Sequence, residues 1–266
     1  MLPDRLVGPE TTGSPAFCSA PPVELREGHY LLRFARTAAD LDAVLKLRFE
    51  VFNLELGEGL ETSFLTGRDQ DEFDLTCHHL MVAEAETGNV VGTYRVQTGE
   101  MAAAAGGFYS AGEFDLSRLP ADVMKNSIEL GRACIAPEHR HTQVLYLLWK
   151  GLAAYLKHER RRYLFGCCSL TSQDAREAWA VMDQLRREGS LHPRFYVPPR
   201  AGFECEPPGQ EKPAVKIPKL FRTYLRIGAK VCGPPAIDRQ FGTIDYFVIM
   251  DIEELSPFSR RMFFGL

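Results

Sequence analysis

Charged residues interrupt the apolar segment 127–136, which otherwise has the composition of a strand. Glu129 and Arg132 are three positions apart, so a regular strand would point their side chains to opposite faces. A bulge at Gly131 would bring both to one face and leave a backbone N–H outside the strand pairing. Such an N–H can bind a carbonyl oxygen or an oxyanion. The segment therefore predicts a polar site at the end of a strand, with an ordinary capped turn into the next helix as the alternative.

An arginine interrupts the apolar face of each of two further predicted elements. Arg48 is spaced three and four positions from Leu45 and Phe52, so it lies on the apolar face of the predicted helix 37–56. Arg95 occupies an apolar strand. A buried arginine needs an acidic partner, because an unpaired buried charge is very costly. The alternatives are an arginine that extends to solvent at the edge of the helix face, and a strand residue that faces solvent.

A helix is expected from about residue 142 to residue 159, directly after the strand with Glu129 and Arg132. The first N–H groups of a helix have no partner within it and favour anions such as a pyrophosphate or the phosphate of phosphopantetheine. The residues that could contact such an anion are Ile135, Arg140, His141, Thr142, Gln143 and Val144.

The elements that position these residues follow the order β-α-β-β-β-α-β-α and a last strand, which predicts one mixed-sheet α/β domain and not a doubly wound one. Residues 78–98 form a predicted hairpin, and Ser172 is the expected N-cap of a helix. The Pro-rich residues 1–28 are expected to be a disordered arm, and residues 29–266 the folded domain.

Composition excludes several classes of protein. The formal net charge of −4 gives no argument for nucleic acid. No apolar segment is long enough for a membrane span, and no signal peptide is expected. The seven cysteines are interpreted as reduced thiols of a cytoplasmic protein. A metal site is not expected, since adjacent His78 and His79 would face opposite ways on a strand.

The succession of strand, bulge and helix start resembles motif A of the GNAT superfamily of acyltransferases. This implies a mixed, mostly antiparallel central sheet flanked by helices. The superfamily's Gln/Arg-x-x-Gly-x-Gly/Ala loop is altered here, because residues 139–144 (HRHTQV) contain no glycine. This departure fits branches of the superfamily that take long acyl chains from acyl carrier protein.

A longer resemblance covers residues 30–260 and includes "DEFDLTCHHLMV", "IELGRACIAPEHR" and "LFRTYLRIGAKVCGPPAIDRQFGTIDYFVIMDI". These segments are similar to the ornithine Nα-acyltransferase family, which makes lyso-ornithine lipid from 3-hydroxyacyl-acyl carrier protein. The skeleton is also similar to acyl-homoserine lactone synthases, although their tryptophan after the first helix is missing. The positions that match the charged cluster of those synthases are Arg48, Phe52, Asp71 or Asp74, Arg95, Glu129 and Arg132.

The resemblance implies amide formation from a thioester, with no cofactor beyond the acyl-phosphopantetheine of the donor. Glu129 is the first candidate for the base that takes the proton of the amine, and Asp71 and Asp74 are next. Arg95 and Arg132 would hold the amino acid carboxylate, or else pair with Glu129. The acidic stretch 50–74 suits the dication ornithine, with a solvated loop as the alternative. Another amino acid, a homoserine lactone synthase and a non-catalytic binding protein are the other hypotheses.

An acidic acyl carrier protein would need a local basic surface on this enzyme. The first candidate surface consists of Arg160, Arg161 and Arg162, with Lys157 beside them. A second basic cluster, on the predicted helix 218–227, could contact anionic lipid at the inner membrane face. A plain solvated face is the alternative for both clusters.

Overall fold

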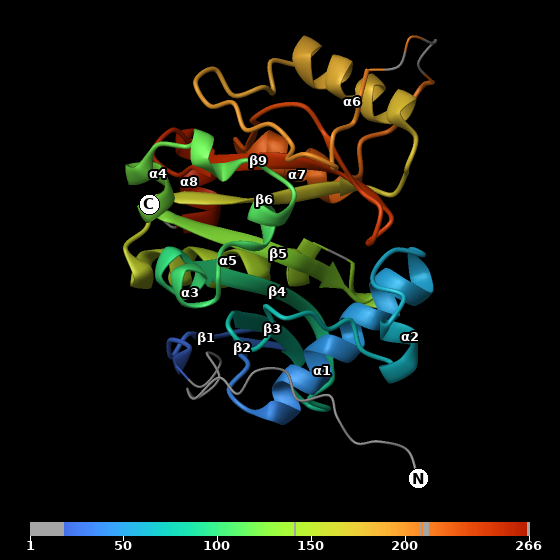
Figure 1. The fold of residues 1–266 in the computed structure, drawn as a ribbon. Helices are drawn as coiled ribbons and strands as arrows, with labels where there is room; N and C mark the ends of the chain where they lie inside the picture. Colours follow the sequence, from blue (N-terminus) through green and yellow to red (C-terminus); the bar gives the residue numbers. More distant parts are fainter. Residues whose placement is uncertain (1–18, 141, 208, 210–212, 265–266) are drawn as a thin grey trace.

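The computed structural model describes residues 19–140, 142–207, 209 and 213–264 of the 266-residue chain. Its centre is a sheet with the strand order β1-β2-β3-β4-β5-β6-β9-β7, and β8 pairs with β9 (Figure 1). Among the described strands, β5 and β6 pair in parallel, whereas the other pairs are antiparallel. This mixed, mostly antiparallel sheet is the GNAT-like architecture that the sequence predicts.

The elements have the following bounds. The strands are β1 (Glu24–Glu27), β2 (Tyr30–Phe34), β3 (His78–Glu84), β4 (Val90–Thr98), β5 (Ser127–Ile135), β6 (Tyr163–Leu170), β7 (Lys230–Val231), β8 (Ala236–Asp238) and β9 (Thr243–Asp251). The α-helices are α1 (Ala38–Phe49), α2 (Ser63–Thr66), α3 (Gly99–Ala104), α4 (Ala121–Lys125), α5 (Thr142–Glu159), α6 (Ala175–Arg187), α7 (Lys219–Ile227) and α8 (Pro257–Phe264). A π-helical turn, Glu50–Glu55, continues α1, and 3₁₀ turns occupy Tyr109–Gly112, Leu116–Arg118 and Pro137–His139.

Helices α1 and α5 cover opposite faces of the β2–β5 half of the sheet. Alternate residues of β3 show this, because Leu80 belongs to the core beneath α5, while Met81 belongs to the core beneath α1. Helices α6 and α7 pack on the β6–β9 half, and the segment from α3 to α4 covers the other face of that half. The face beneath α1 and the α3–α4 segment is the one that receives the polar site.

Local sequence rules explain where these elements begin. Thr37 caps α1 and forms a capping box with Asp40, as predicted. The hairpin β3–β4 and helix α5 also form where they are expected. The predicted cap at Ser172 is wrong, because α6 begins at Ala175 with Asp174 as its N-cap. The Ser172 hydroxyl accepts instead from the N–H of Asp174, since it lies two residues before the cap.

The boundary expected at residues 28 and 29 does not hold in the structure. Residues 24–27 form β1, which pairs with β2 along its whole length, and Ala20 is buried in the core. The pairing explains the difference, because the edge of β2 offers free backbone groups that the preceding segment satisfies. Residues 1–18 of the predicted arm lie outside the described part of the chain.

Candidate active site

The bulge predicted in β5 exists, one residue later than expected. Arg95 of β4 is opposite Gly131, whereas Thr93 is opposite Cys134, so β5 has one residue more than β4 between these two pairs. Arg132 adopts the left-handed conformation, with φ of 47°. A non-glycine residue there is strained and persists only where its surroundings hold it, which is frequent at functional sites. The bulge brings Arg132 to the face that also carries Glu129.

Arg48 is fully buried, with no exposed surface, and it lies between two aspartates. Its Nε donates to Oδ2 of Asp69 at 2.6 Å, and its Nη1 donates to Oδ1 of Asp74 at 2.7 Å. This is the acidic partnership that a buried arginine requires. The alternative, an arginine that extends to solvent, is wrong for Arg48.

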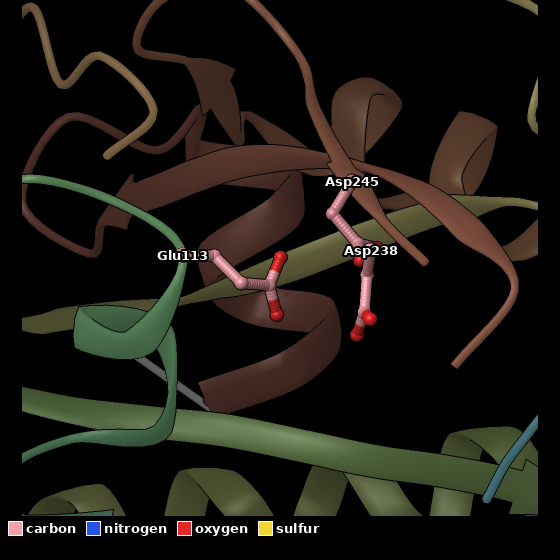
Figure 2. Close-up of side chains that lie close together, drawn as sticks. All are labelled: Glu113, Asp238 and Asp245. Carbon is pink, nitrogen blue, oxygen red and sulfur yellow. The ribbon is translucent and has the colours of Figure 1, made fainter. Parts of the chain in front are cut away.

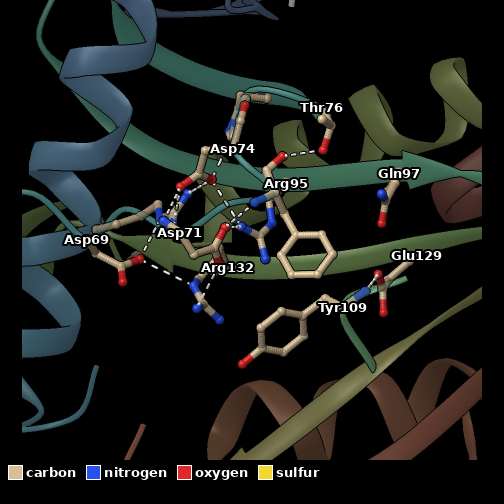
Figure 3. A network of polar contacts seen from close by, with 12 residues as sticks. Asp69, Asp71, Asp74, Thr76, Arg95, Gln97, Tyr109, Glu129 and Arg132 are labelled. Atoms are coloured by element: carbon tan, nitrogen blue, oxygen red, sulfur yellow. Dashed lines mark hydrogen bonds and ion pairs between the residues drawn. The ribbon is translucent and has the colours of Figure 1, made fainter. Parts of the chain in front are cut away.

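Arg95 and Arg132 bind the same group of acidic residues (Figure 3). Arg95 Nη1 lies 2.5 Å from Oδ1 of Asp71 and 3.0 Å from Oδ1 of Asp74. Arg132 lies 3.1 Å from Asp71 and 3.3 Å from Asp69. We call these residues the arginine–aspartate network; its members are Arg48, Arg95, Arg132, Asp69, Asp71 and Asp74. Three cations thus meet three anions, and the partners of Arg95 and Arg132 are aspartates and not Glu129.

The network holds Asp71 and Asp74 in the ionised form. Burial raises the pKa of Asp74, but Arg48 and Arg95 lower it more, so the net pKa lies well below the ordinary value. Burial also raises the pKa of Asp71, but Arg95 lowers it, and the net pKa is again below the ordinary value. Because a general base works best with a pKa near the operating pH, this environment argues against Asp71 and Asp74 as bases.

Glu129 binds the backbone of a neighbouring turn. Its carboxylate accepts from the N–H groups of Tyr109 and Ser110, each at 2.8 Å, and from the Ser110 hydroxyl. Burial raises the pKa of Glu129, while the hydrogen bonds from Ser110 and Tyr109 oppose the rise. Two oxygens offer about four acceptor positions, so three donors leave one position open.

The turn held by Glu129 brings Tyr109 against the arginines. The Tyr109 ring centroid is 4.8 Å from Cζ of Arg132 and 5.4 Å from Cζ of Arg95. Guanidinium groups are attracted to aromatic faces at such distances. Figure 3 shows Glu129, Tyr109 and Arg132 on one side of β5, so the turn forms one wall of the polar site.

A cavity of about 340 Å³ extends from this polar site to the opposite face of the sheet. The polar part of its lining includes Glu58, Arg95, Gln97, Glu129, Arg132 and Asp245. The apolar part includes Trp149, Leu152, Leu164, Tyr224, Met250 and Phe264. The two parts belong to different faces, and β5 pairs with β6 only over Ser127–Glu129 and Tyr163–Phe165. The cavity therefore passes through the opening where these two parallel strands separate.

Four of the predicted anion-binding residues do not line this cavity; they are Ile135, Arg140, Gln143 and Val144. Arg140 pairs with Glu55 at 2.5 Å and donates to the carbonyl oxygen of Ile135. The Gln143 amide donates to the carbonyl oxygen of Glu27, and Val144 is fully buried in the core. His141 and the side chain of Thr142 lie outside the described residues.

The three arginines that were predicted to dock a carrier protein differ in whether they form ion pairs. Arg161 pairs with Glu100, and Arg162 pairs with Asp251 and Glu253. Arg160 is exposed, and no acidic side chain among the described residues lies within 4.0 Å of it. The structure therefore assigns two of the three charges to intramolecular ion pairs.

Three buried carboxylates near β9 were not predicted from the sequence, and one of them, Asp245, lines the cavity. Asp245 lies within the apolar strand β9, and this interruption was the only local signal. Glu113 follows a turn, and Asp238 ends the three-residue strand β8, so neither has a periodicity that indicates burial. Gln97 lies two positions after Arg95 on β4, and its contact with the cavity depends on the separation of β5 and β6.

The fold and the cavity together define an acyltransferase of the GNAT type, and residues 47–150 match the acetyltransferase (GNAT) domain family. The L-ornithine N(alpha)-acyltransferase of Brucella abortus (strain 2308) is 33% identical over 256 residues, which cover 87% of each chain. That of Rhizobium meliloti (strain 1021) is 32% identical, over 84% of this chain and 80% of the relative. The chain belongs to the L-ornithine N(alpha)-acyltransferase family.

The structure is also similar to that of the AHL synthase LasI. The similarity covers 90% of this chain and 96% of LasI, with 13% identity and a TM-score of 0.49. No helix among the described residues combines the length and the apolar character that crossing a membrane requires.

Proposed function

We propose that this protein transfers a fatty acyl group from an acyl carrier protein thioester to the α-amine of L-ornithine. The observation that supports this most directly is the cavity, which joins a polar site to an apolar compartment through the opening between β5 and β6. A thioester with a long acyl chain needs both environments. The relatives named L-ornithine N(alpha)-acyltransferase support ornithine as the acceptor. Nothing favours a homoserine lactone synthase or a non-catalytic protein.

In the proposed reaction the amine nitrogen attacks the thioester carbonyl carbon. A C–N bond forms, the C–S bond breaks, and the products are an amide and the thiol of phosphopantetheine. Gly131, Arg132 and Ala133 line the cavity, and a bulge leaves its extra residue outside the ladder. A backbone N–H of this segment would stabilise the oxyanion on the carbonyl oxygen. The phosphopantetheine arm would approach along the start of α5, near Arg140 and Gln143.

Glu129 would take the proton that the attacking amine loses, directly or through one water, and would then pass this proton to the leaving thiolate. The open acceptor position and the raised pKa of Glu129 both suit this role. Gln97 would orient the amine, because its buried Oε1 has no hydrogen-bond partner among the described residues. Arg95 and Arg132 would face the acceptor carboxylate, and Arg48, Asp71 and Asp74 would hold these two arginines in place.

The decisive experiment is to incubate the purified protein with a 3-hydroxyacyl-acyl carrier protein and ornithine. Mass spectrometry should show N-acylornithine and free carrier thiol in equal amounts. Hydrolysis of the thioester without amide formation, or equal turnover without ornithine, would refute the proposal.

The identity of the donor has its own test. We propose that Arg160 helps the protein to dock an acidic carrier protein. We also propose that the protein is cytoplasmic, with peripheral contact at the inner membrane face. Arg160→Glu should raise KM for the carrier-protein donor several-fold at low salt and change KM for the matching CoA thioester little, because exposed charges interact over about 10 Å at 0.1 M salt. Arg36→Glu, at an exposed position before α1, is the matched control. Equal KM values for Arg160→Glu and the wild type would contradict docking at Arg160.

A further inference from the structure

A second group of carboxylates lies beside the cavity, outside the arginine–aspartate network. We call Glu113, Asp238 and Asp245 the carboxylate cluster. They come from the end of the Tyr109–Gly112 turn, from β8 and from β9, and their exposed fractions are 4%, 6% and 3%. One carboxylate oxygen of each lies within 4.8 Å of the other two. Figure 2 shows the three side chains extending toward a common space.

The cluster differs from the network in its charge balance. Asp245 accepts from the hydroxyls of Ser169, at 2.5 Å, and Thr243, at 3.0 Å. Asp238 accepts from two backbone N–H groups, each at 2.9 Å. Among the described residues, no Lys, Arg or His side chain lies within 4.0 Å of these three carboxylates.

Glu113 shows most directly that a partner is missing. Its Oε2 is buried and has no hydrogen-bond partner among the described residues. Burial, together with the charges of Asp245 and Asp238, raises the pKa of Glu113 to about 10. Glu113 therefore keeps a proton at neutral pH. A cation bound among the three carboxylates would displace this proton, because it would compensate their buried negative charge.

The cavity brings a ligand to the cluster. Asp245 lines it together with Arg132 and Glu129, which belong to the proposed reaction site. Glu58, another buried carboxylate, also lines the cavity and accepts from Thr171. A molecule in the cavity can thus contact the arginines and also Asp245, the member of the cluster that lines the cavity.

We propose that the carboxylate cluster binds the side-chain ammonium of the amino acid acceptor. This inference rests on the proposed function and adds the residues that select a dicationic amino acid. An ammonium has three N–H donors. At a hydrogen-bond length of about 2.8 Å, tetrahedral geometry separates its three acceptors by about 4.6 Å. That spacing lies within the 4.8 Å that encloses the three oxygens of the cluster.

The inference also reassigns the charge that recognises ornithine. The acidic stretch 50–74 was expected to face the ammonium, but its Asp69, Asp71 and Asp74 pair with arginines, and Glu58 is the acidic residue of this stretch that lines the cavity. In the described part of the chain, no arginine or lysine forms an ion pair within 4.0 Å of the carboxylate cluster. Acceptor selectivity should therefore depend on Glu113 and Asp245, and not on Asp71.

The test compares ornithine with norvaline, which has the same carbon skeleton without the terminal amine. The quantity measured is the ratio of the kcat/KM values for these acceptors with one saturating acyl donor. The wild type should prefer ornithine by a factor of about 100 or more, because a site built for a polar group rejects analogues that lack it. Glu113→Gln and Asp245→Asn should each reduce the ratio by a factor of about 10 or more, mainly through ornithine. Glu138→Gln, at an exposed position before α5, is the matched control.

Each outcome distinguishes the inference from the proposed function. Unchanged ratios in both variants, with ornithine turnover intact in the wild type, would overturn the inference alone. Failure of the wild type to acylate ornithine would overturn the proposed function. If Glu113→Gln does not fold, Asp245→Asn decides. Thermal stabilisation of the wild type by Ca²⁺ or Mg²⁺ that Glu113→Gln loses, with unchanged ratios, would assign the cluster to a metal and also overturn the inference.

Discussion

Replacing Asp74 with asparagine tests whether the arginine–aspartate network stabilises the fold by charge compensation. The Asp74 carboxylate accepts from Arg48 at 2.7 Å, from Arg95 at 3.0 Å and from the backbone N–H of Asp71 at 2.8 Å. Asparagine keeps the size of the side chain but removes the charge and turns an amide N–H₂ toward a guanidinium. Loss of one partner from a buried ion pair costs about 3–5 kcal/mol. That is a large part of the roughly 5–15 kcal/mol that stabilises a typical domain.

Urea unfolding followed by circular dichroism measures this cost. With an m-value of about 3 kcal/mol/M, the midpoint for Asp74→Asn should fall by about 1 M or more. Asp71→Asn is the matched comparison, because Asp71 also contacts two arginines but its side chain is 12% exposed. Its loss should be about 1–2 kcal/mol, since solvent replaces part of the interaction. Equal midpoints for the wild type and Asp74→Asn would refute the argument. Folded Asp71→Asn should also keep the preference for ornithine over norvaline.

Three further predictions follow from single buried positions. Burial lowers the pKa of His79 to about 4, against the charge of Asp74. The folded protein is therefore most stable above about pH 6.5, where His79 is neutral in both states, and it loses stability as the pH falls toward 4. The loss at pH 5 should be about 2 kcal/mol. Urea midpoints for His79→Gln should depend less on pH than those of the wild type. Gly166→Ala should destabilise the fold by about 1–3 kcal/mol in the same assay, because a Cβ there would overlap the carbonyl oxygen of Leu130; an unchanged midpoint would contradict this contact. If Glu129 is the base, Glu129→Gln should lower kcat by about 100-fold and remove the acidic limb of the pH profile for kcat. A lower kcat with that limb intact would show that Glu129 only holds the Tyr109 turn in place.

The sequence by itself determined the main elements and the polar character of one face. The capping box at Thr37 and the apolar periodicity of α5 are local patterns, and local patterns specify helices directly. The spacing of Glu129 and Arg132 also predicted a bulge, because two charges on opposite faces of a strand in a buried sheet would be unfavourable. The bulge at Arg132 and not at Gly131 depends on the register with β4, which is a non-local pairing.

Only the tertiary structure decided which charges meet. Arg48 was predicted to need an acidic partner, but its partners Asp69 and Asp74 lie 21 and 26 residues away, in a segment without regular secondary structure. The carboxylate cluster joins segments separated by more than 120 residues along the chain, so no local spacing indicates it. Electrostatic pairing depends on distance in space and on burial, and both are set by chain packing. For this reason the sequence specified which residue types the site needs. The fold decided which of the described carboxylates pair with arginines, namely Asp69, Asp71 and Asp74, and which do not, namely Glu113, Asp238 and Asp245.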